Sequence, residues 1–464
     1  MRVCGRGIRL WWQGSNCGGG CQPAIIAAWR QPRHLVEERA MGRDAWLLVG
    51  ALLMGVGAGL GAAEAELVPP KLLSIRGGLG NVFAKLEAGG VVSIAYFGGS
   101  ITAAPGWRPK TLKWFQATWP KARVTEVNAA IGGTGSDLGV FRCGQDVLAH
   151  KPDLVFVEFA VNDGGAAPEA IYRSLEGIVR QVWRANPETD ICFVYTIHKA
   201  FIPDYERGFC NRSTTAHEKV ADHYAIPSIN MAMRVAELHK AGKLIFPFPP
   251  KETPPEGKMV FAHDDCHPTD AGHELFTQVI TDALKEIQKA SRPGPHKLPE
   301  PLRPDNWEHA KLVPIAPSML TSGWRKLPTD DGLGKWFGNR LPAIWEATRP
   351  GEKLSFRFKG TLARLYDLVG PDGGKAICSV DGKVTRTVQR FDMYCTGHRL
   401  ATLPIAEGLE DKEHAVTVEV SPEQPDREPV LKQVRGQKGF DPKRYDGTVL
   451  RVGYIMLLGD LINP

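Results

Sequence analysis

Hydrophobic and polar residues follow two different periods along residues 90–290. Short apolar runs, rich in β-branched and aromatic residues, have the length of buried strands; they occupy residues 91–97, 123–128, 153–159, 190–196 and 226–229. Between and after them, apolar residues recur at helical spacing, which predicts helices over 109–119, 137–150, 171–182, 214–224 and 270–287. Regular alternation of strand and helix is typical of a doubly wound parallel sheet covered by helices on both faces. We therefore expect an α/β fold of the three-layer, flavodoxin-like kind.

The pattern changes at about residue 307, where stretches of period-two alternation replace the helical spacing. These runs are separated by turn residues and occupy 354–358, 363–368, 376–380, 415–420 and 449–458. They predict a second, smaller all-β domain over residues 307–464, either a sandwich or a jelly roll. Residues 291–306, rich in Pro, are interpreted as a linker between this domain and an α/β domain at residues 66–290.

Residues 41–65 have the three parts of a secretory signal peptide. Arg43 supplies the positive start, residues 46–60 a short apolar core, and Ala63-Glu64-Ala65 a cleavage site of the small-x-small type. The apolar core is shorter than the roughly 20 residues that a membrane span needs. We therefore expect a secreted or periplasmic protein with no membrane span after cleavage. Met41 is then the true start and residues 1–40 a start-site error, the alternative being an unusually long leader.

The net charge bears on whether the protein binds nucleic acid, and the cysteine content bears on whether it is exported. The net charge is +6, of which the first 65 residues supply +3, so +3 remains for the rest of the chain. This surplus is too small to favour a nucleic-acid partner. Six cysteines follow residue 65, an even number that permits disulfides in an exported protein. Cys378 and Cys395 are the first pair we expect, and buried single thiols are an equal alternative for the other four.

Residues able to carry chemistry follow the ends of the predicted strands. Ser100 follows the first strand, Gly133 the second and Asn162 the third, whereas Asp264 and His267 lie just before the last helix. The carboxyl ends of parallel strands meet at one edge of a sheet, so these residues are expected to form one site. A serine in such a place needs a base and an oxyanion hole before it can act as a nucleophile.

At these positions the sequence resembles the SGNH hydrolases, the broad GDSL-like esterase superfamily. The resemblance covers roughly residues 90–290 and is carried by four blocks in the family's order. Ser100 lies in the nucleophile block Gly98-Gly99-Ser100-Ile101-Thr102, and Asp264-Asp265-Cys266-His267 matches the Asp-x-x-His block. Gly133 and Asn162 match the two oxyanion blocks. Two positions depart from the family pattern: Gly99 replaces the usual Asp, and Ala160 replaces the usual Gly.

The resemblance implies an esterase with a two-step acyl transfer and no cofactor. His267 takes the proton from Ser100 and Asp264 orients the imidazole. The oxyanion hole consists of the N–H groups of Ser100 and Gly133 together with the side-chain amide of Asn162. The mechanism needs neither a metal ion nor an organic cofactor.

Three alternatives concern the histidine block, and two further residues are candidates for the substrate pocket. His263, Asp264, His267 and His273 could bind a metal, but that hypothesis leaves Ser100, Gly133 and Asn162 unexplained. Cys266 could be a nucleophile and Asp265 the orienting acid, although a structural thiol and the spacing of Asp264 are favoured. His198 and Tyr195, which end the fourth strand, are candidates for lining the pocket, and a surface turn is an equal alternative.

The substrate class is predicted from the second domain and the signal peptide. The β-domain carries Trp307, Trp324, Trp336 and Trp345, and exposed aromatics can stack on sugar rings, although core packing is the commoner use of Trp. The domain resembles accessory jelly rolls of secreted carbohydrate esterases, which is an analogy at the level of the fold. We expect removal of O-acetyl groups from a carbohydrate. A polysaccharide O-acetyltransferase and a non-catalytic glycan-binding protein are the alternatives.

Overall fold

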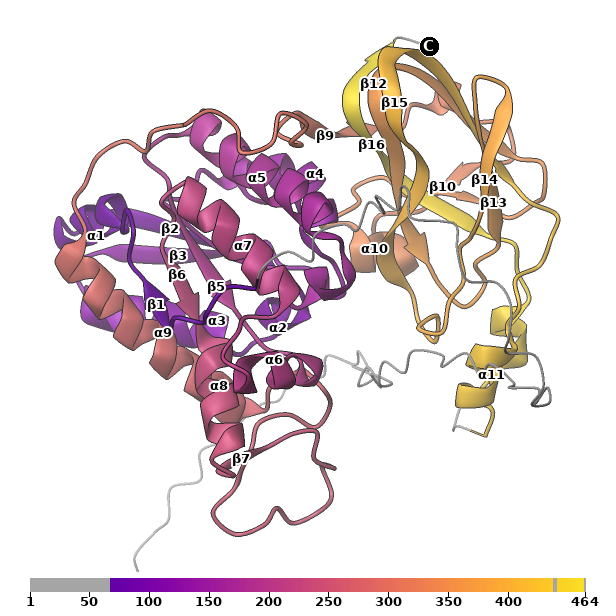
Figure 1. The fold of residues 1–464 in the computed structure, drawn as a ribbon. Helices are drawn as coiled ribbons and strands as arrows, with labels where there is room; N and C mark the ends of the chain where they lie inside the picture. The colour runs from indigo at the N-terminus through magenta and orange to yellow at the C-terminus, as the bar shows by residue number, and fades with distance from the viewer. Residues whose placement is uncertain (1–66, 437–439, 463–464) are drawn as a thin grey trace, which may run out of the picture. The chain divides into compact units, whose positions relative to one another are not determined.

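The structure is a computed structural model that describes residues 67–436 and 440–462. The predicted signal peptide and the start at Met41 lie outside these residues. Two regions are distinguished below: the α/β region, residues 67–290, and the β region, residues 310–462 (Figure 1). The predicted combination of an α/β sheet with a second, all-β part is confirmed. Within the described residues, no helix is both long and apolar enough to cross a membrane.

The α/β region is built on a six-stranded sheet, in the order β1-β6-β5-β4-β2-β3. Its strands are β1 (Leu73–Ser74), β2 (Val91–Gly98), β3 (Arg123–Asn128), β4 (Leu154–Glu158), β5 (Asp190–Tyr195) and β6 (Ser228–Asn230). Strands β2 to β6 are parallel, and the short β1 adds an antiparallel edge to β6. The order reverses at β2, between β3 and β4, which is the switch point where doubly wound sheets hold their ligands.

Helices cover both faces of this sheet. They are α1 (Gly80–Glu87), α2 (Ser100–Ala103), α3 (Trp107–Thr118), α4 (Ser136–Asp146), α5 (Pro168–Ala185), α6 (Ile202–Glu206), α7 (Arg212–His223), α8 (Met231–Lys240) and α9 (Asp270–Ala290). The apolar sides of α4, α5 and α7 pack in one core with one face of the sheet. Those of α1, α3, α8 and α9 pack in a second core with the other face. The sequence pattern missed α1 and α8, which are short helices beside stronger signals.

Short elements complete this region. Single 3₁₀ turns are η1 (Leu148–His150), η2 (Asn162–Gly165) and η3 (Lys199–Phe201), and a two-stranded parallel pair joins β7 (Leu244–Ile245) to β8 (Met259–Val260). η2 follows β4 and η3 follows β5, so both lie at the carboxyl edge of the sheet.

The β region is one antiparallel sheet with the order β10-β11-β16-β12-β15-β13-β14, and β9 also pairs with β16. Its strands are β9 (Ala310–Pro314), β10 (Arg325–Lys326), β11 (Trp345–Ala347), β12 (Lys353–Val369), β13 (Lys375–Val380), β14 (Lys383–Gln389), β15 (Arg399–Val420) and β16 (Leu450–Ile462). Its helices are α10 (Gly332–Phe337) and α11 (Glu428–Val434), with the turns η4 (Pro317–Met319) and η5 (Pro442–Tyr445). The jelly-roll arrangement stays a prediction.

One difference from the sequence pattern concerns β12, which joins two predicted runs into a single strand. The runs are separated by a β-bulge after Gly360, which faces Gly459 of β16. Both glycines have positive φ, +154° and +142°, and a Cβ on either would overlap the backbone of the other strand. A glycine in this place reads as a turn in the sequence, but here it allows close approach of two strands within a bent sheet.

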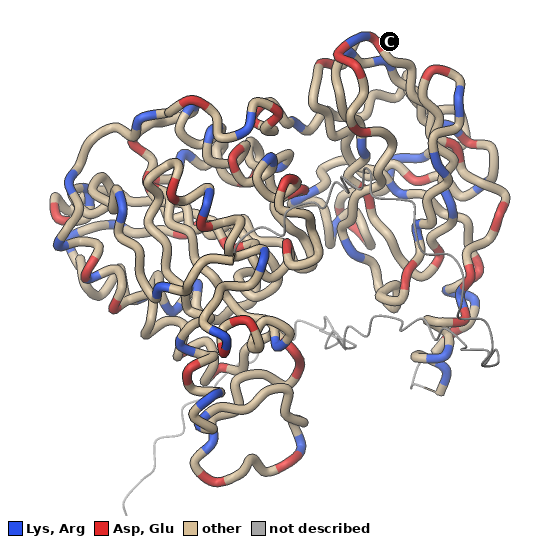
Figure 2. The backbone as a smooth tube through the Cα atoms, viewed as in Figure 1, with Lys and Arg blue, Asp and Glu red and all other residues tan. Residues whose placement is uncertain are grey.

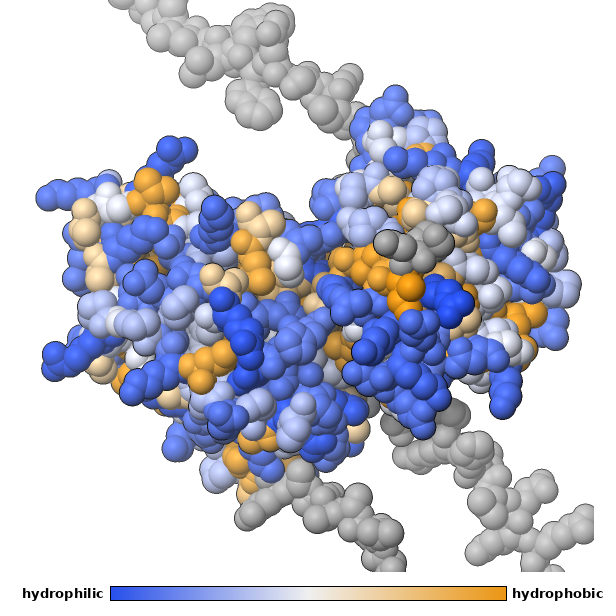
Figure 3. All heavy atoms as spheres, turned by 90° about the horizontal axis from the view of Figure 1, so that it is seen from above, coloured by the Kyte–Doolittle hydropathy of each residue, from blue (hydrophilic) through white to orange (hydrophobic). Residues whose placement is uncertain are grey.

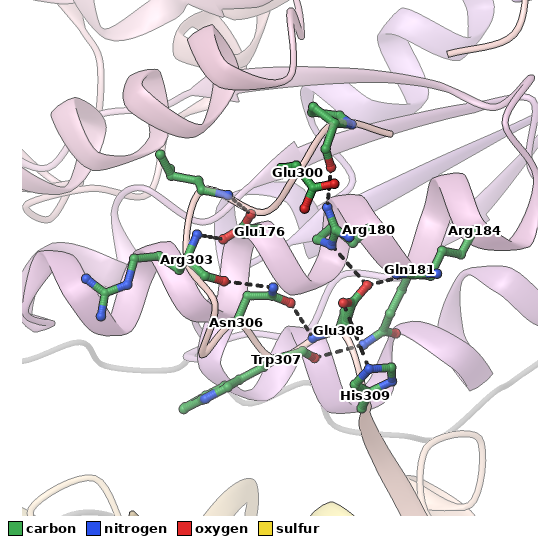
Figure 4. Close-up of polar contacts among 12 residues, drawn as sticks. Glu176, Arg180, Gln181, Arg184, Glu300, Arg303, Asn306, Trp307, Glu308 and His309 are labelled. Atoms are coloured by element: carbon green, nitrogen blue, oxygen red, sulfur yellow. Dashed lines mark hydrogen bonds and ion pairs between the residues drawn. The ribbon is translucent and has the colours of Figure 1, made fainter. Parts of the chain in front are cut away.

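The predicted linker is bound along helix α5 (Figure 4). The buried carboxylate of Glu176 accepts hydrogen bonds from the N–H groups of Leu302 and Arg303, at 2.5 and 2.9 Å. The Arg180 guanidinium donates to the carbonyl of Pro299 and to Glu308. Residues 299–308 are therefore fixed to the α/β region by buried polar contacts rather than free to swing.

The expected disulfide is absent from the structure. The six cysteines within the described residues, Cys378 and Cys395 among them, are free thiols. Cys378 packs in the main core of the β region, whereas Cys395 belongs to a separate apolar cluster with Val369 and Phe391. The prediction of a Cys378–Cys395 bridge was wrong because position along the chain does not tell which cluster a side chain joins.

The surface carries mixed charge. Figure 2 shows Lys and Arg interspersed with Asp and Glu along both regions, with no broad stretch of one sign. On the face drawn in Figure 3, hydrophobic residues form small groups within a mostly hydrophilic surface.

Candidate active site

Ser100 lies at the carboxyl end of β2, where the strand passes through Gly98 and Gly99 into helix α2. Strand β2 is flanked by β3 and β4, so Ser100 is at the switch point of the sheet. Its Oγ is 2.7 Å from Nε2 of His267, which arrives from the loop before α9. The structure thus brings together two residues that are 167 positions apart in the sequence.

The other ring nitrogen of His267 contacts Asp264. Nδ1 is 2.9 Å from Asp264 Oδ2, and Asp264 Oδ1 accepts hydrogen bonds from the backbone N–H groups of Cys266 and His267, at 2.9 and 2.7 Å. Burial disfavours the ionised carboxyl, but these three donors more than offset it and lower the pKa of Asp264 to about 2. Because a carboxylate can only accept, the neutral imidazole carries its proton on Nδ1. Nε2 is then free to accept the Ser100 proton.

The loop after β3 passes beside the nucleophile. A Cβ placed on Gly132 would lie 3.5 Å from the Ser100 Cβ, and Gly133 adopts φ +72° with open space where its side chain would be. The Asn162 side chain lies on the other flank, at the start of η2. Within the described residues, no acceptor takes the Gly133 N–H or the Asn162 amide. Both donors are therefore available to a bound oxyanion.

The two departures from the family pattern have a structural explanation. A Cβ on Gly99 would overlap the Asn162 Oδ1, so the position as built here accepts only glycine. Ala160 is completely buried, and its carbonyl accepts a 2.6 Å hydrogen bond from the Ser213 hydroxyl. The usual residues are thus replaced without displacing the groups that surround Ser100.

A buried acid that sequence reasoning missed lies behind the nucleophile turn. Glu158, the last residue of β4, accepts hydrogen bonds from the hydroxyls of Thr102 and Thr196, at 2.9 and 2.6 Å. Burial raises the pKa of this carboxyl to about 7, although the two hydroxyls favour ionisation. The available signal was a glutamate inside the otherwise apolar run of residues 154–159.

A second buried acid supports the oxyanion residues. Asp163 follows Asn162, and its Oδ1 accepts from the Ser136 N–H at 2.9 Å while its Oδ2 contacts the buried His217 ring at 2.9 Å. Ser136 begins helix α4, directly after the loop of Gly133. Asp163 therefore ties the turn that holds Asn162 to the end of the loop that holds Gly133.

The two candidates for the substrate pocket have different positions. His198 is half-buried near the histidine loop: Lys199, its neighbour, donates a backbone hydrogen bond to the Asp265 carbonyl at 2.7 Å. Burial lowers the pKa of His198, against the opposing effect of Asp265 and Asp264. Tyr195 is fully enclosed, and its hydroxyl donates to Glu218 at 2.6 Å. Tyr195 therefore does not line the site, because its side chain points into the core beneath the strand.

The alternatives at the histidine loop are tested by these contacts. Within the described residues, the group close enough to share a metal is Asp264, Cys266 and His267, which is the triad loop itself. His263 instead contacts the carbonyl of Phe248, and His273 accepts the Trp107 N–H. Burial raises the pKa of the Cys266 thiol to about 12, so it stays protonated and unreactive at neutral pH.

A hollow of about 250 Å³ lies beside the Gly133 loop. Residues 133–135 and 137–138 form one wall, and the β region forms the other. That second wall includes the charged side chains of Arg390, Asp392 and Arg399. The hollow is therefore polar and is shared by the two regions.

Comparison with known proteins agrees with this geometry. Residues 96–275 match the GDSL-like Lipase/Acylhydrolase family, whose members are carboxylic ester hydrolases. Two crystal structures of a two-domain esterase (CEX) active on acetylated mannans, one of them co-crystallised with mannopentaose, have a similar fold. The co-crystal structure is 24% identical to this chain and the other structure is 23% identical, and both have a TM-score of 0.64. Each match covers 84% of this chain; it covers 96% of the chain in the co-crystal structure and 97% of the chain in the other. No curated protein sequence matches the chain significantly.

Proposed function

We propose that this chain, whose residues 96–275 belong to the GDSL-like lipase/acylhydrolase family, is an esterase that removes O-acetyl groups from a carbohydrate through an acyl-enzyme on Ser100. The observation that carries the proposal is the continuous link from Ser100 Oγ through His267 to Asp264, at 2.7 and 2.9 Å. Two unoccupied donors, Gly133 N–H and the Asn162 amide, flank the same serine. A nucleophile, its base and its oxyanion hole are the groups that acyl transfer requires.

The first half of the reaction forms the acyl-enzyme. His267 Nε2 takes the Ser100 proton while Oγ attacks the acetyl carbonyl carbon, and ionised Asp264 stabilises the imidazolium. The N–H groups of Ser100 and Gly133 and the Asn162 amide hold the oxyanion of the tetrahedral intermediate. As the intermediate collapses, the bond to the sugar oxygen breaks and His267 returns its proton to that oxygen.

The second half releases acetate. His267 takes a proton from water, whose oxygen attacks the acetyl carbon, and the proton then returns to Ser100 as acetate leaves. A sugar hydroxyl in place of water would make the same machinery an acetyltransferase. All the groups in both steps belong to this chain.

Carbohydrate as the substrate class is supported by four observations. The similar two-region fold belongs to an esterase active on acetylated mannans. The hollow beside Gly133 is polar and of sugar size. Trp336 is 72% exposed, unlike the buried Trp307 and Trp324, and is free to stack on a sugar ring. The signal-like residues 41–65 support export, where polysaccharides are encountered.

The test measures acetate release from acetylated mannan and acetylated xylan by the full chain, beside Ser100→Ala. Ser93→Ala, on the strand that leads to the nucleophile but without a contact to His267, is the matched control. We expect release by the wild type and by Ser93→Ala, and none above background by Ser100→Ala. Equal release by Ser100→Ala would contradict the mechanism, and release from neither polysaccharide would contradict the substrate class. Adding an unacetylated oligosaccharide separates hydrolysis from transfer by its products.

A further inference from the structure

The loop that carries Gly133 is held by hydrogen bonds on both sides of its backbone. We call residues 128–135 the oxyanion loop. Two of its N–H groups donate toward β2: Ala129 to the Tyr96 carbonyl and Ile131 to the Gly98 carbonyl, each at 3.0 Å. These bonds fix one side of the loop within the α/β region.

The carbonyls of the same loop meet two arginines. Arg340 Nη2 donates to the carbonyls of Asn128 and Ala130, at 2.7 and 3.4 Å. Arg142 donates to the carbonyl of Ala129, which lies between them. Three successive carbonyls are therefore bound by two guanidinium groups, whose planar forks suit such contacts better than an ammonium would.

One carboxylate holds both arginines in place. Oδ2 of Asp146 is 2.9 Å from Arg142 Nη1 and 3.0 Å from Arg340 Nη1. The Asp146 side chain is 3% exposed, Arg142 is fully buried over the Phe97 ring, and Arg340 is 14% exposed. Because water is excluded, each of these buried charges must be compensated by its ion-pair partners. Moving one side chain therefore leaves a buried charge uncompensated, so the three side chains hold one arrangement.

Arg340 belongs to the β region, whereas Arg142, Asp146 and the oxyanion loop belong to the α/β region. It lies between α10 and β11, and its carbonyl accepts a hydrogen bond from Gln145 at 3.1 Å. The next residue, Leu341, is 1% exposed and packs against Gly453 of β16. The β region therefore supplies the backbone that carries Arg340, while Asp146 and Gln145 of α4 hold its guanidinium and its carbonyl.

A second contact from the β region reaches the far end of the loop. Arg364 of β12 lies 3.4 Å from Asp137, in the first turn of α4, and also pairs with Glu407. Its guanidinium stacks over the Trp307 ring at 5.1 Å. The β region thus contacts the segments before and after Gly133.

We propose that Arg340 is a positioning residue for the oxyanion hole, through which the β region holds the Gly133 N–H in its catalytic place. The inference rests on the esterase function proposed above. It assigns the β region a part in the chemistry itself, separate from any glycan that this region binds. The consequence is that even a small ester, too small to touch a glycan site, requires an intact Arg340.

The experiment uses the full chain with p-nitrophenyl acetate and the variants Arg340→Ala, Arg340→Lys and Arg325→Ala. Arg325 is the matched control, since it is also an arginine of the β region paired with a buried acid, Glu346, but it does not contact the loop. We expect Arg340→Ala to lower kcat about tenfold, less than the roughly 10²–10³ of a removed oxyanion donor because the Gly133 N–H is shifted rather than lost, with KM within about twofold. The kcat of Arg340→Lys should lie between those of the wild type and Arg340→Ala, because lysine keeps the positive charge beside Asp146 but lacks the planar guanidinium that bonds two carbonyls. Arg325→Ala should leave both constants unchanged.

Backbone amide hydrogen exchange gives a second readout that does not depend on turnover. Exchange in residues 128–135 should become about tenfold faster in Arg340→Ala and stay at the wild-type rate in Arg325→Ala. A folded Arg340→Ala with wild-type kcat and wild-type exchange in the loop would overturn the inference. So would a change in KM alone. If the wild type does not turn over any ester, the proposed function has failed, and exchange in the loop still decides whether Arg340 holds it.

Discussion

The buried acids beside the catalytic residues have different partners from three acids of the β region. Next to the catalytic residues, Glu158 meets two threonine hydroxyls and Asp163 meets a backbone N–H and a histidine ring. In the β region, three buried or half-buried acids face an arginine: Asp367 pairs with Arg390 at 2.7 Å, and both Asp372 and Glu346 pair with Arg451 at 2.6 Å.

The difference separates two uses of a buried charge. An acid bonded bidentately by arginine has its charge balanced and its geometry fixed, which suits a framework. Burial without a cationic partner raises the pKa of Glu158 to about 7, within the proton-transfer range. We therefore expect changes at the catalytic residues to lower activity, and the change at Asp372 of the β region to lower stability with activity unchanged.

The largest effect is expected at the base. His267→Ala should lower kcat for p-nitrophenyl acetate by about 10⁴-fold or more, because Ser100 loses the proton acceptor that contacts its Oγ. His198→Ala is the matched control at the same edge of the sheet. The His198 ring accepts from the Ala200 N–H and does not contact Ser100, so the loss should stay below about tenfold. Equal losses in the two variants would contradict the assignment of the base.

A smaller loss is expected from crowding the oxyanion hole. In Gly99→Ala the new methyl overlaps the Asn162 Oδ1 and pushes that amide away, so kcat should fall about 10²-fold, as it should in Asn162→Ala. Gly132→Ala, whose methyl would meet only ordinary contacts, is the control and should keep wild-type kcat. Steady-state kinetics on the three variants measures this. Wild-type activity in Gly99→Ala would show that Asn162 is not needed where the structure places it.

Glu158→Gln tests whether a buried acid that is hydrogen-bonded by uncharged groups makes the free energy of unfolding depend on pH. The pKa is about 7 in the folded chain and lower in the unfolded chain, so the folded state holds a proton that the unfolded state has lost between these values. The wild type should then lose about 3 kcal/mol of unfolding free energy as the pH rises from about 4.5 to 7, a loss that glutamine avoids. Urea denaturation of both proteins across this range measures the slope. Parallel curves would mean that Glu158 is ionised throughout.

The smallest effect on activity is expected from Asp372→Asn in the β region. Despite partial burial, the bidentate Arg451 and the neighbouring His398 hold the pKa of Asp372 well below its usual range. Its contribution to stability is present above the ordinary aspartate pKa and is lost as the pH falls below it. At pH 7 the substitution should cost about 2 kcal/mol of unfolding free energy with unchanged kcat per folded molecule. A tenfold loss of kcat in a folded variant would break the distinction between the two regions.

The α/β sheet and the candidate triad could be predicted from the sequence because each rests on local signals. Strand-like runs followed by Ser100, Gly133 and Asn162 place these residues at one sheet edge, whatever the loops do. The structure brings Ser100, Asp264 and His267 into contact, in accordance with that expectation. Asp264 rather than Asp265 meets the ring, as the spacing favoured.

The remaining contacts could not be predicted because they depend on how distant surfaces pack. Arg340 meets the Asn128 carbonyl across 212 positions, and nothing local to either residue indicates the other. Tyr195 ends a strand at the correct edge, but the side chains of a strand alternate between its faces, and Tyr195 points toward Glu218. Cys378 and Cys395 were paired by position alone, and their separate clusters exclude the bond.

The measurement that tests the central claim most directly is hydrolysis of p-nitrophenyl acetate by the full chain beside Ser100→Ala. Ser100 is the group that every step above depends on, and its Oγ contacts His267 at 2.7 Å. The account predicts turnover by the wild type and a loss of about 10⁴-fold or more in a folded Ser100→Ala. Equal turnover by the two proteins would contradict it, because the nucleophile would then lie elsewhere.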